Sequence, residues 1–287
     1  MRVSLDQLIK YRLTEKKPPM TNKSTISLLR GLVGYKNLLI GGVKQDIQQR
    51  YVGSIFGIFW AILYPMAQLS IYAILYVFVF RVRPDGMDEW GYVLLVFSGL
   101  IPLMAFNEIL AATTNSLLAN KALLLNTVFP AELIPIRSAL ASQVPSFCGL
   151  VITLILAILL GRLEWRLIVF VPVLWILLFM FAVGIGWVLS LIALVAKDLQ
   201  QLLGLITMLI VMLSPFAYTP EMVPSLLRPI IYSNPLSYFV LSFQQIICYG
   251  YIENIIPFLV SFFLAIASFF IGFTFFVRIK SLFFDHV

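Results

Sequence analysis

Six long runs of apolar residues constrain this chain more than any other feature of its sequence. About 20 apolar residues cross the hydrocarbon core of a bilayer as one helix. A soluble domain has roughly 25% charged residues, whereas this chain has 11% and is 61% hydrophobic. The runs are continuous rather than alternating, which argues against a β-barrel. The sequence therefore predicts an all-α membrane protein with six transmembrane helices, over residues 54–80, 91–117, 136–160, 167–195, 201–218 and 254–277.

The positively charged residues lie mostly on one side of these predicted spans. Residues 1–53 hold ten of the twenty Lys and Arg residues, and five more follow the second, fourth and sixth spans. Cytoplasmic segments carry an excess of Lys and Arg. We therefore predict a multi-pass membrane protein with both termini cytoplasmic, in tails at 1–25 and 278–287. The net charge of +7 then reflects this topology and contact with anionic membrane lipid, and we expect no nucleic-acid partner.

Residues 26–53 are not apolar enough to span a membrane, but their apolar residues are regularly spaced. Leu39, Val43 and Ile47 recur at every fourth position, opposite Lys44. This spacing predicts an amphipathic helix in the cytoplasmic membrane interface, leading directly into the first span. A solvated linker helix is the alternative.

Residues 219–253 form the second irregular stretch, since they are apolar and aromatic but contain four prolines. They predict short re-entrant helices on the outer face, with their backbone buried against protein. The alternative is a seventh span near 236–252. That span would carry Arg278 and Lys280 to the outside, against the distribution of positive charge.

The sequence lacks the residues that a reaction centre needs. It has no G-x-x-x-x-G-K-[ST] motif to hold ATP phosphates, its single histidine is His286, and Cys148 and Cys248 form no metal-binding pattern. A hydrolase or transferase would need a nucleophile, a base or a metal site. We therefore predict a transport pathway without catalytic residues, without a metal and without a cofactor bound by this chain.

Polar and aromatic residues inside the spans mark the predicted pathway. Aromatic faces with hydroxyl tips suit sugars, whose C–H surfaces stack on rings. The predicted pathway residues are Trp60, Tyr64, Gln68, Tyr72, Tyr76 and Glu108. The alternatives are that the aromatic stripe packs against another helix, and that a neighbouring hydroxyl or amide holds Glu108. Gly53 and Gly57 form a G-x-x-x-G pair, a possible close-packing face.

A short apolar helix between the second and third spans is too short to cross the membrane. Prolines interrupt it, and the predicted topology puts it on the cytoplasmic side, so its apolar face suits a groove on a soluble partner. The predicted coupling helix covers 120–132. Its predicted contact residues are Lys121, Leu124, Asn126, Phe129, Pro130 and Glu132.

Three segments resemble the permeases of ABC-type polysaccharide exporters, which export O-antigen, capsule and teichoic acid chains. "LLLNTVFPAELIP" resembles the family's coupling segment, "RYVGSIFGIFWAILYP" the start of its first span, and "YTPEMVP…NPLSYFV" its outer re-entrant region. The resemblance covers roughly residues 35–280. Relatives often carry an Arg soon after the Asn-Pro, where this chain has FQQIICYG.

The resemblance implies a homodimer of this chain with two copies of a separate ATPase subunit that binds MgATP. A lipid-linked polysaccharide would pass from the cytoplasmic to the outer side between the two permeases. The amphipathic helix would act as a gate, through Leu39, Val43, Lys44, Ile47 and Arg50. The alternatives are an ABC permease for a drug or small lipid, and an ion-coupled secondary transporter or membrane-embedded enzyme.

Overall fold

The computed structural model describes residues 34–81, 84, 86–121, 130–162, 164–196 and 198–284. Within these ranges the secondary structure is helical and contains no strand. The chain divides into two units, Met1–Lys36 and Asn37–Val287. The second unit contains every helix named below, apart from the first residue of α3. The prediction of an all-helical protein is therefore confirmed for the part of the chain that the structure describes.

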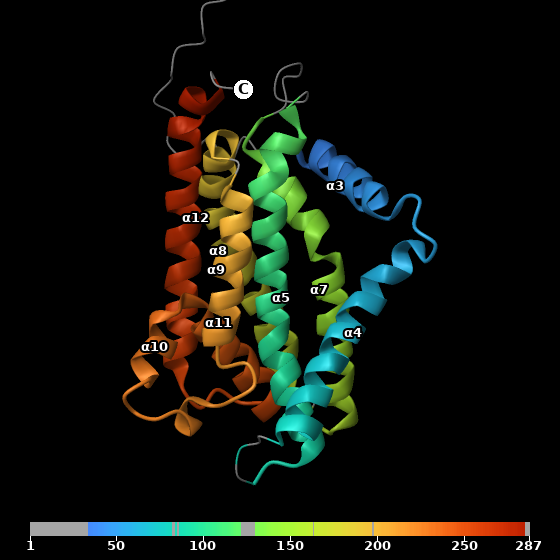
Figure 1. Cartoon of the computed structure of the whole chain (residues 1–287), viewed down its shortest axis with the longest axis vertical. Coiled ribbons are helices and arrows are strands. Elements are labelled where there is room, and N and C mark those ends of the chain that lie inside the picture. Colours follow the sequence, from blue (N-terminus) through green and yellow to red (C-terminus); the bar gives the residue numbers. More distant parts are fainter. Residues whose placement is uncertain are drawn as a thin grey trace, which may run out of the picture. The chain divides into compact units, whose positions relative to one another are not determined.

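Five helices in the described residues are long and apolar enough to cross a membrane. Their bounds differ from five of the six predicted spans by a few residues. The first span consists of a 3-10 turn at Gly57–Phe59, α4 and a π-helical end at Ile74–Phe80. The spanning helices are α4 (Trp60–Ala73), α5 (Glu89–Ala119), α7 (Leu133–Leu159), α8 (Trp165–Val195) and α12 (Ile255–Phe284) (Figure 1).

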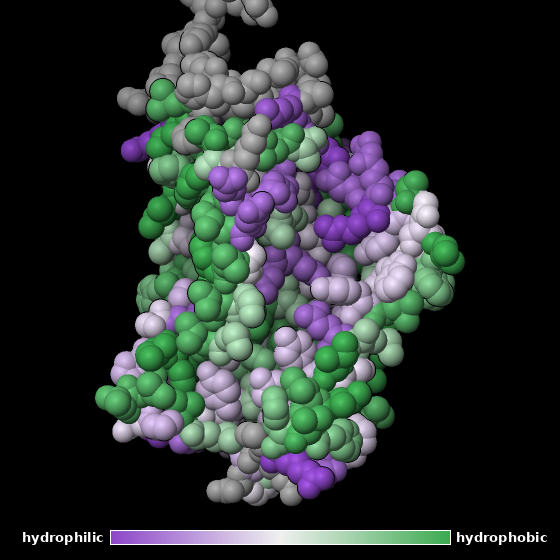
Figure 2. All heavy atoms as spheres, in the orientation of Figure 1, coloured by the Kyte–Doolittle hydropathy of each residue, from purple (hydrophilic) through white to green (hydrophobic). Residues whose placement is uncertain are grey.

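The helix α5 lies at the centre of the second unit, where it packs against α7, α8 and α11 (Figure 1). Its first turn is capped by Asp88, whose carboxylate accepts a hydrogen bond from the Gly91 amide at 3.3 Å. Most of its apolar stretch is buried, whereas only 11% of that of the first span and 22% of that of α12 is buried. Figure 2 shows hydrophobic side chains over much of the visible face, with hydrophilic ones gathered around α3.

The fifth predicted span, 201–218, is interrupted in the structure. The helix α9 (Leu199–Leu213) has 15 residues, which rise about 22 Å and fall short of the roughly 30 Å hydrocarbon core. It ends because Ser214 is extended, with ψ 138°, as the residue before Pro215 favours. The apolar run continues past the proline, so hydropathy alone does not reveal this end.

Small residues let α8 and α12 pack backbone against backbone. A Cβ at Gly272 would overlap the carbonyl oxygen of Gly184, and a Cβ at Gly184 would overlap Ser268. The Ser268 hydroxyl donates a hydrogen bond to the Phe181 carbonyl at 2.8 Å. Such close approach is typical of helix pairs in membranes, where packing between small residues drives association.

The G-x-x-x-G pair predicted as a packing face has another role. Gly53 and Gly57 have φ angles of 78° and 51°, and nothing lies within 4 Å of a Cβ built at either. They occupy the turn between α3 and the first span, where the backbone adopts the left-handed region that glycine tolerates. Within the described residues of this chain the pair makes no close helix contact, and a packing role against another chain stays a prediction.

The region 219–253 contains α10 (Arg228–Ser233), α11 (Pro235–Gln244) and a π-helical end at Gln245–Tyr249. The ring of Phe239 stacks on Phe181 deep in the bundle. The Cys248 thiol lies 3.7 Å from the Gly91 carbonyl, at the first turn of α5. The helical run from α11 is not among the five candidate spans. Short helices are therefore present as predicted, and their re-entrant place in a membrane stays a prediction.

Candidate functional site

The helix α3 (Lys36–Tyr51) lies at the same end of the second unit as the C-terminal end of α12, whereas α10 lies at the opposite end (Figure 1). Leu39, Val43 and Ile47 are half-buried and Lys44 is exposed, but Leu38 and Ile40 are 50% and 65% exposed, so the amphipathic character of this helix stays a prediction. Of the predicted helix 26–53, residues 26–33 lie outside the described ones. Its position in a membrane interface stays a prediction.

An ion pair fixes α3 to the first turns of α7. The Arg137 Nε donates a hydrogen bond to Asp46 Oδ2 at 2.8 Å, and its Nη2 donates to the second carboxylate oxygen. The Arg137 side chain is only 11% exposed and that of Asp46 22%. A Cβ at Gly42 would lie 2.7 Å from the Arg137 Cδ, so this glycine leaves the room that the arginine stem needs. We call this contact the α3 latch.

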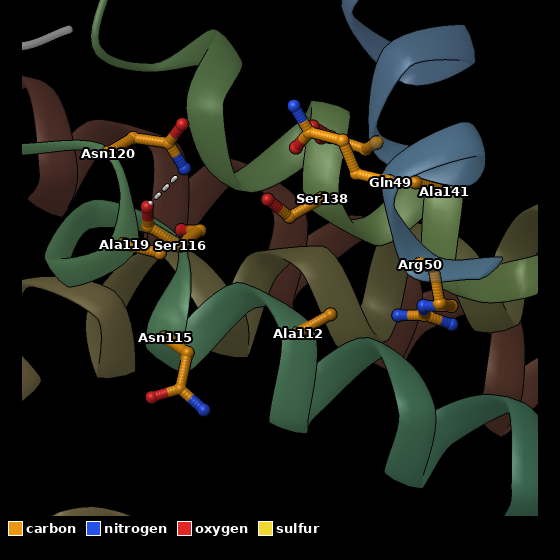
Figure 3. Close-up of a pocket in the computed structure, with 10 residues that line it drawn as sticks. Gln49, Arg50, Ala112, Asn115, Ser116, Ala119, Asn120, Ser138 and Ala141 are labelled. Carbon is orange, nitrogen blue, oxygen red and sulfur yellow. Dashed lines mark hydrogen bonds between the residues drawn. The ribbon is translucent and has the colours of Figure 1, made fainter. Parts of the chain in front are cut away.

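A polar pocket of about 280 Å³ lies beside the α3 latch. Its walls come from α3, the last turns of α5 and the first turns of α7 (Figure 3). The lining residues are Asp46, Gln49, Arg50, Ala112, Asn115, Ser116, Ala119, Asn120, Ser138 and Ala141. We call it the junction pocket. It contains the predicted gate residue Arg50, with amide and hydroxyl groups across from it.

Tyr51 follows Arg50 at the end of α3. Burial raises the pKa of the Tyr51 phenol, and the positive charge of Arg50 opposes this rise. The phenol therefore keeps its proton at neutral pH and stays a hydrogen-bond donor.

A second ion pair joins the start of α7 to the end of α12. The Lys280 ammonium donates to the Glu132 carboxylate, whose side chain is 9% exposed. The Trp187 indole of α8 donates to the Glu132 backbone carbonyl at 3.0 Å, and its ring contacts Phe269 and Phe273. Glu132, the last residue of the predicted coupling segment, is thus held at the start of α7 by contacts from α8 and α12.

The second ion pair leads to a stability prediction. Replacing Lys280 by methionine leaves the Glu132 carboxylate buried without its partner. The cost is expected to be about 2 kcal/mol, below the 3–5 kcal/mol of a fully buried pair, because Lys280 is one third exposed. Glu132→Gln is expected to cost less, and the double variant less than the sum of the two. Thermal unfolding in detergent measures these differences, with the exposed Arg278→Met as a control. Additive losses would contradict the pair.

The predicted aromatic stripe of α4 divides into two parts. Toward the end of the first span that is farther from α3, Tyr72 and Tyr76 stack on each other with ring centroids 6.4 Å apart. Both rings meet Phe216 edge to face, at 5.5 and 5.7 Å. Trp60 contacts Phe56 instead. The structure therefore brings Tyr72 and Tyr76 together and leaves Trp60 outside this cluster.

The other predicted pathway residues have different surroundings. Tyr64 is exposed, and the buried Oε1 of Gln68 has no hydrogen-bond partner among the residues that the structure describes. The Glu108 carboxylate accepts a hydrogen bond from the Ser146 hydroxyl at 2.7 Å. A neighbouring hydroxyl thus holds Glu108, which agrees with the alternative given for this residue in the sequence analysis. A role of these residues in a pathway stays a prediction.

Phe216 belongs to the unwound segment 214–219 that follows α9. Gln244 of α11 donates from its Nε2 to the carbonyls of Pro215 at 3.0 Å and Phe216 at 3.2 Å. The Tyr92 hydroxyl of α5 donates to the Ala217 carbonyl at 2.8 Å. Irregular backbone at membrane depth is tolerated where protein groups satisfy it in this way.

Asn234 connects the same segment to α11. Its Oδ1 caps α11 by accepting a hydrogen bond from the Leu236 amide at 3.0 Å. Its Nδ2 donates to the Ile210 carbonyl at 3.1 Å and to the Ser214 hydroxyl at 2.8 Å, at the end of α9. The Asn-Pro pair therefore joins the end of α9 to the start of α11.

The predicted coupling residues are only partly described. Leu124, Asn126 and Phe129 lie outside the described residues. Lys121 follows α5 and is half-buried, as is Pro130. Glu132 lies at the start of α7, and its side chain faces Lys280.

Sequence reasoning missed the partners that hold this site together. Arg137 and Lys280 entered only as charges in the topology, and Asp46 and Gln244 did not enter at all. Opposite charges were the one available signal. Arg137 lies 91 residues from Asp46, and Lys280 lies 148 residues from Glu132, so no local pattern joins them.

Comparison with known proteins identifies the family to which this chain is similar. A family model described as ABC-2 type transporter matches residues 39–248. The chain is 27% identical over 217 residues to the O-antigen export system permease protein RfbA of Klebsiella pneumoniae, a match covering 75% of this chain and 81% of that relative. It is 26% identical over 198 residues to a protein of the same name from Myxococcus xanthus, covering 67% and 72%.

The fold and the site define a helical multi-pass membrane protein, with a polar junction at one end and a broken helix inside. The chain belongs to the ABC-2 type transporter family, and it is the membrane component of a transporter. The family resemblance identified from the sequence is confirmed.

Proposed function

We propose that this chain is the transmembrane subunit of an ATP-driven exporter that moves a lipid-linked polysaccharide from the cytoplasmic to the outer side of the bacterial inner membrane. The family match over residues 39–248, together with relatives named O-antigen export permeases, carries the proposal. The described residues contain no group of His, Cys, Asp or Glu that could hold a metal ion.

The proposed assembly contains two copies of this chain and two copies of a cytoplasmic ATP-binding subunit. Exposed apolar side chains run along α4 and α9, among them Ile62, Leu205 and Leu209. These faces would lie against lipid or the second copy. Both termini would be cytoplasmic, with α3 and the 120–132 segment on that side. MgATP would bind only to the partner.

In this proposal α3 is the cytoplasmic gate and the 120–132 segment docks on the ATP-binding subunit. The ion pair between Glu132 and Lys280 supports such a coupling, because a displacement of the 120–132 segment by the ATP-binding subunit would be transmitted to α12. The α3 latch gives the gate a defined closed position.

The aromatic stripe would guide the sugar chain, which leads to a test at Tyr64. This ring is 52% exposed and makes no ring contact or hydrogen bond within the described residues. Tyr64→Ala is therefore expected to leave stability within about 0.5 kcal/mol while polysaccharide export falls. The neighbouring Leu63→Ala, at 40% exposure, is the matched control. Surface polysaccharide is measured by immunoblot at equal permease levels. Normal export by Tyr64→Ala would remove this ring from the pathway.

Co-purification tests the assembly. The chain is extracted from its native membrane in mild detergent and analysed by mass spectrometry and an ATPase assay. We expect a stoichiometric ATP-binding subunit whose recovery falls when the 120–132 segment is altered. A stable oligomer of this chain without ATPase activity would contradict the proposal and favour an ion-coupled carrier.

A further inference from the structure

We propose that the junction pocket binds the phosphate-bearing head group of a lipid, and that the α3 latch builds this pocket by holding one of its walls in place. The inference rests on the proposed function, because it assigns the pocket to the lipid end of the exported molecule. It adds a binding site, a ligand chemistry and a link between ligand binding and the position of α3.

The charge of the pocket favours an oxyanion. Its two charged lining residues are Asp46 and Arg50. The Asp46 carboxylate is already held by both nitrogens of the latch arginine, so it presents little free negative charge. Arg50 is exposed, and although it hydrogen-bonds the Tyr51 phenol, it keeps further N–H donors for a ligand or water. The nearby Glu108 carboxylate accepts a hydrogen bond from Ser146.

Neutral donors complete the lining. Asn120 donates one N–H to the Ser116 carbonyl at 2.8 Å, and Asn115 donates one to the Ala111 carbonyl at 3.3 Å. Each amide nitrogen has a second N–H. Figure 3 shows Gln49 and Arg50 on α3, with Ser138 and the α5 residues across the space between them. One arginine among neutral donors is the set that binds phosphate oxygens with charge-assisted hydrogen bonds.

The surroundings of the pocket favour a lipid over a soluble anion. Directly after Arg50 and Tyr51, the turn into the first span exposes apolar side chains. Ile55 is 97% exposed, Phe56 54% and Phe59 66%. A molecule with an anionic head and an apolar tail would satisfy both surfaces at once, because its tail would cover this apolar turn while its head occupies the pocket.

The α3 latch connects ligand binding to the position of α3. Three lining residues come from α3 and the others from α5 and α7, so the pocket exists only while α3 is docked. A ligand that binds the complete pocket must stabilise the docked position of α3, and docking must raise affinity by the same factor. Breaking the latch therefore weakens binding without removing any proposed ligand contact.

Hydrogen exchange of the α3 amides in the purified full-length chain tests the proposal. Farnesyl diphosphate is the probe, and farnesol is the neutral control. The probe is expected to slow exchange over residues 36–51 about tenfold, a common size for coupling between sites, whereas farnesol has no effect. Exchange over α12 serves as the internal reference.

Two variants separate the latch from the ligand contact. Arg137→Gln is expected to raise exchange of α3 without the probe and to weaken protection by it. Arg50→Gln is expected to leave exchange unchanged without the probe and to abolish protection. Lys36→Gln, at the exposed first residue of α3, is the matched control and should behave as the wild type. Full protection of Arg50→Gln would overturn the assignment of the pocket.

Further probes identify which molecule supplies the oxyanion. An export assay in cells separates a failure of the pocket inference from a failure of the proposed function. Equal protection by inorganic diphosphate would overturn the lipid assignment, and equal protection by phosphatidylglycerol would assign the pocket to membrane phospholipid instead. No protection by any probe, in a chain that supports polysaccharide export in cells, would overturn the pocket inference and leave the proposed function intact. Absence of export would overturn the proposed function whatever the exchange data show.

Discussion

Gly272→Ala is expected to prevent the chain from forming its native helix packing. The added Cβ would overlap the Gly184 carbonyl oxygen. That atom belongs to the backbone of α8, so no side chain can rotate away, and α8 and α12 must separate. Overpacking usually costs 1–3 kcal/mol, and we expect about 3 kcal/mol or more here. Fluorescence-detected gel filtration and thermal unfolding in detergent measure the loss.

Gly204→Ala is the matched control for this substitution. Nothing lies within 4 Å of a Cβ at Gly204 in α9. Alanine also favours the helix by about 1 kcal/mol over glycine, so this variant is expected to be as stable as the wild type or slightly more so. A Gly272→Ala protein that elutes and unfolds like the Gly204→Ala protein would show that the α8–α12 contact is looser than described.

Gln244→Leu is expected to release the unwound segment 214–219. The leucine removes the donor that the carbonyls of Pro215 and Phe216 share. An unsatisfied buried polar group costs about 1–3 kcal/mol, so a total loss of about 3 kcal/mol is expected. The segment should also open to solvent, because among the described residues only Tyr92 and Asn234 would still tie it to α5 and α11 by side-chain hydrogen bonds. Thermal unfolding measures the first effect, and hydrogen exchange over the segment measures the second.

Two further variants sharpen the test at Gln244. Gln244→Glu has the same shape, but an ionised carboxylate only accepts hydrogen bonds, so it is expected not to restore stability. Gln201→Leu, at an exposed position of α9, is expected to change little. Equal stability of Gln244→Leu and Gln201→Leu would show that the segment is held without the amide.

The sequence predicts the long helices well because hydropathy alone sets their place. Runs of more than 20 apolar residues can bury their backbone groups in lipid only as helices, and five of the six runs appear within a few residues of the expected bounds. The regular spacing of Leu39, Val43 and Ile47 likewise marks three residues of α3 that are half-buried in the structure. Both signals are local, so one sequence contains them.

The sequence does not predict how the elements are joined. The end of α9 is marked by Pro215, yet its unwound chain is stable only because groups of α5 and α11 bind its carbonyls. The α3 latch depends on a glycine that leaves room for Arg137, and Gly42 has no distinguishing local pattern. The coupling role of Glu132 was predicted from a segment of sequence, whereas its ion-pair partner lies on the last helix.

Transport by the reconstituted complex tests the central claim most directly. The chain and its ATP-binding subunit are placed in proteoliposomes with a lipid-linked polysaccharide, and the polysaccharide that reaches the far side is detected with an impermeant lectin. We expect translocation that requires ATP, stops with an ATPase-deficient partner and falls with Tyr64→Ala. Translocation driven by a proton gradient without the partner, or none with an active ATPase, would contradict the account.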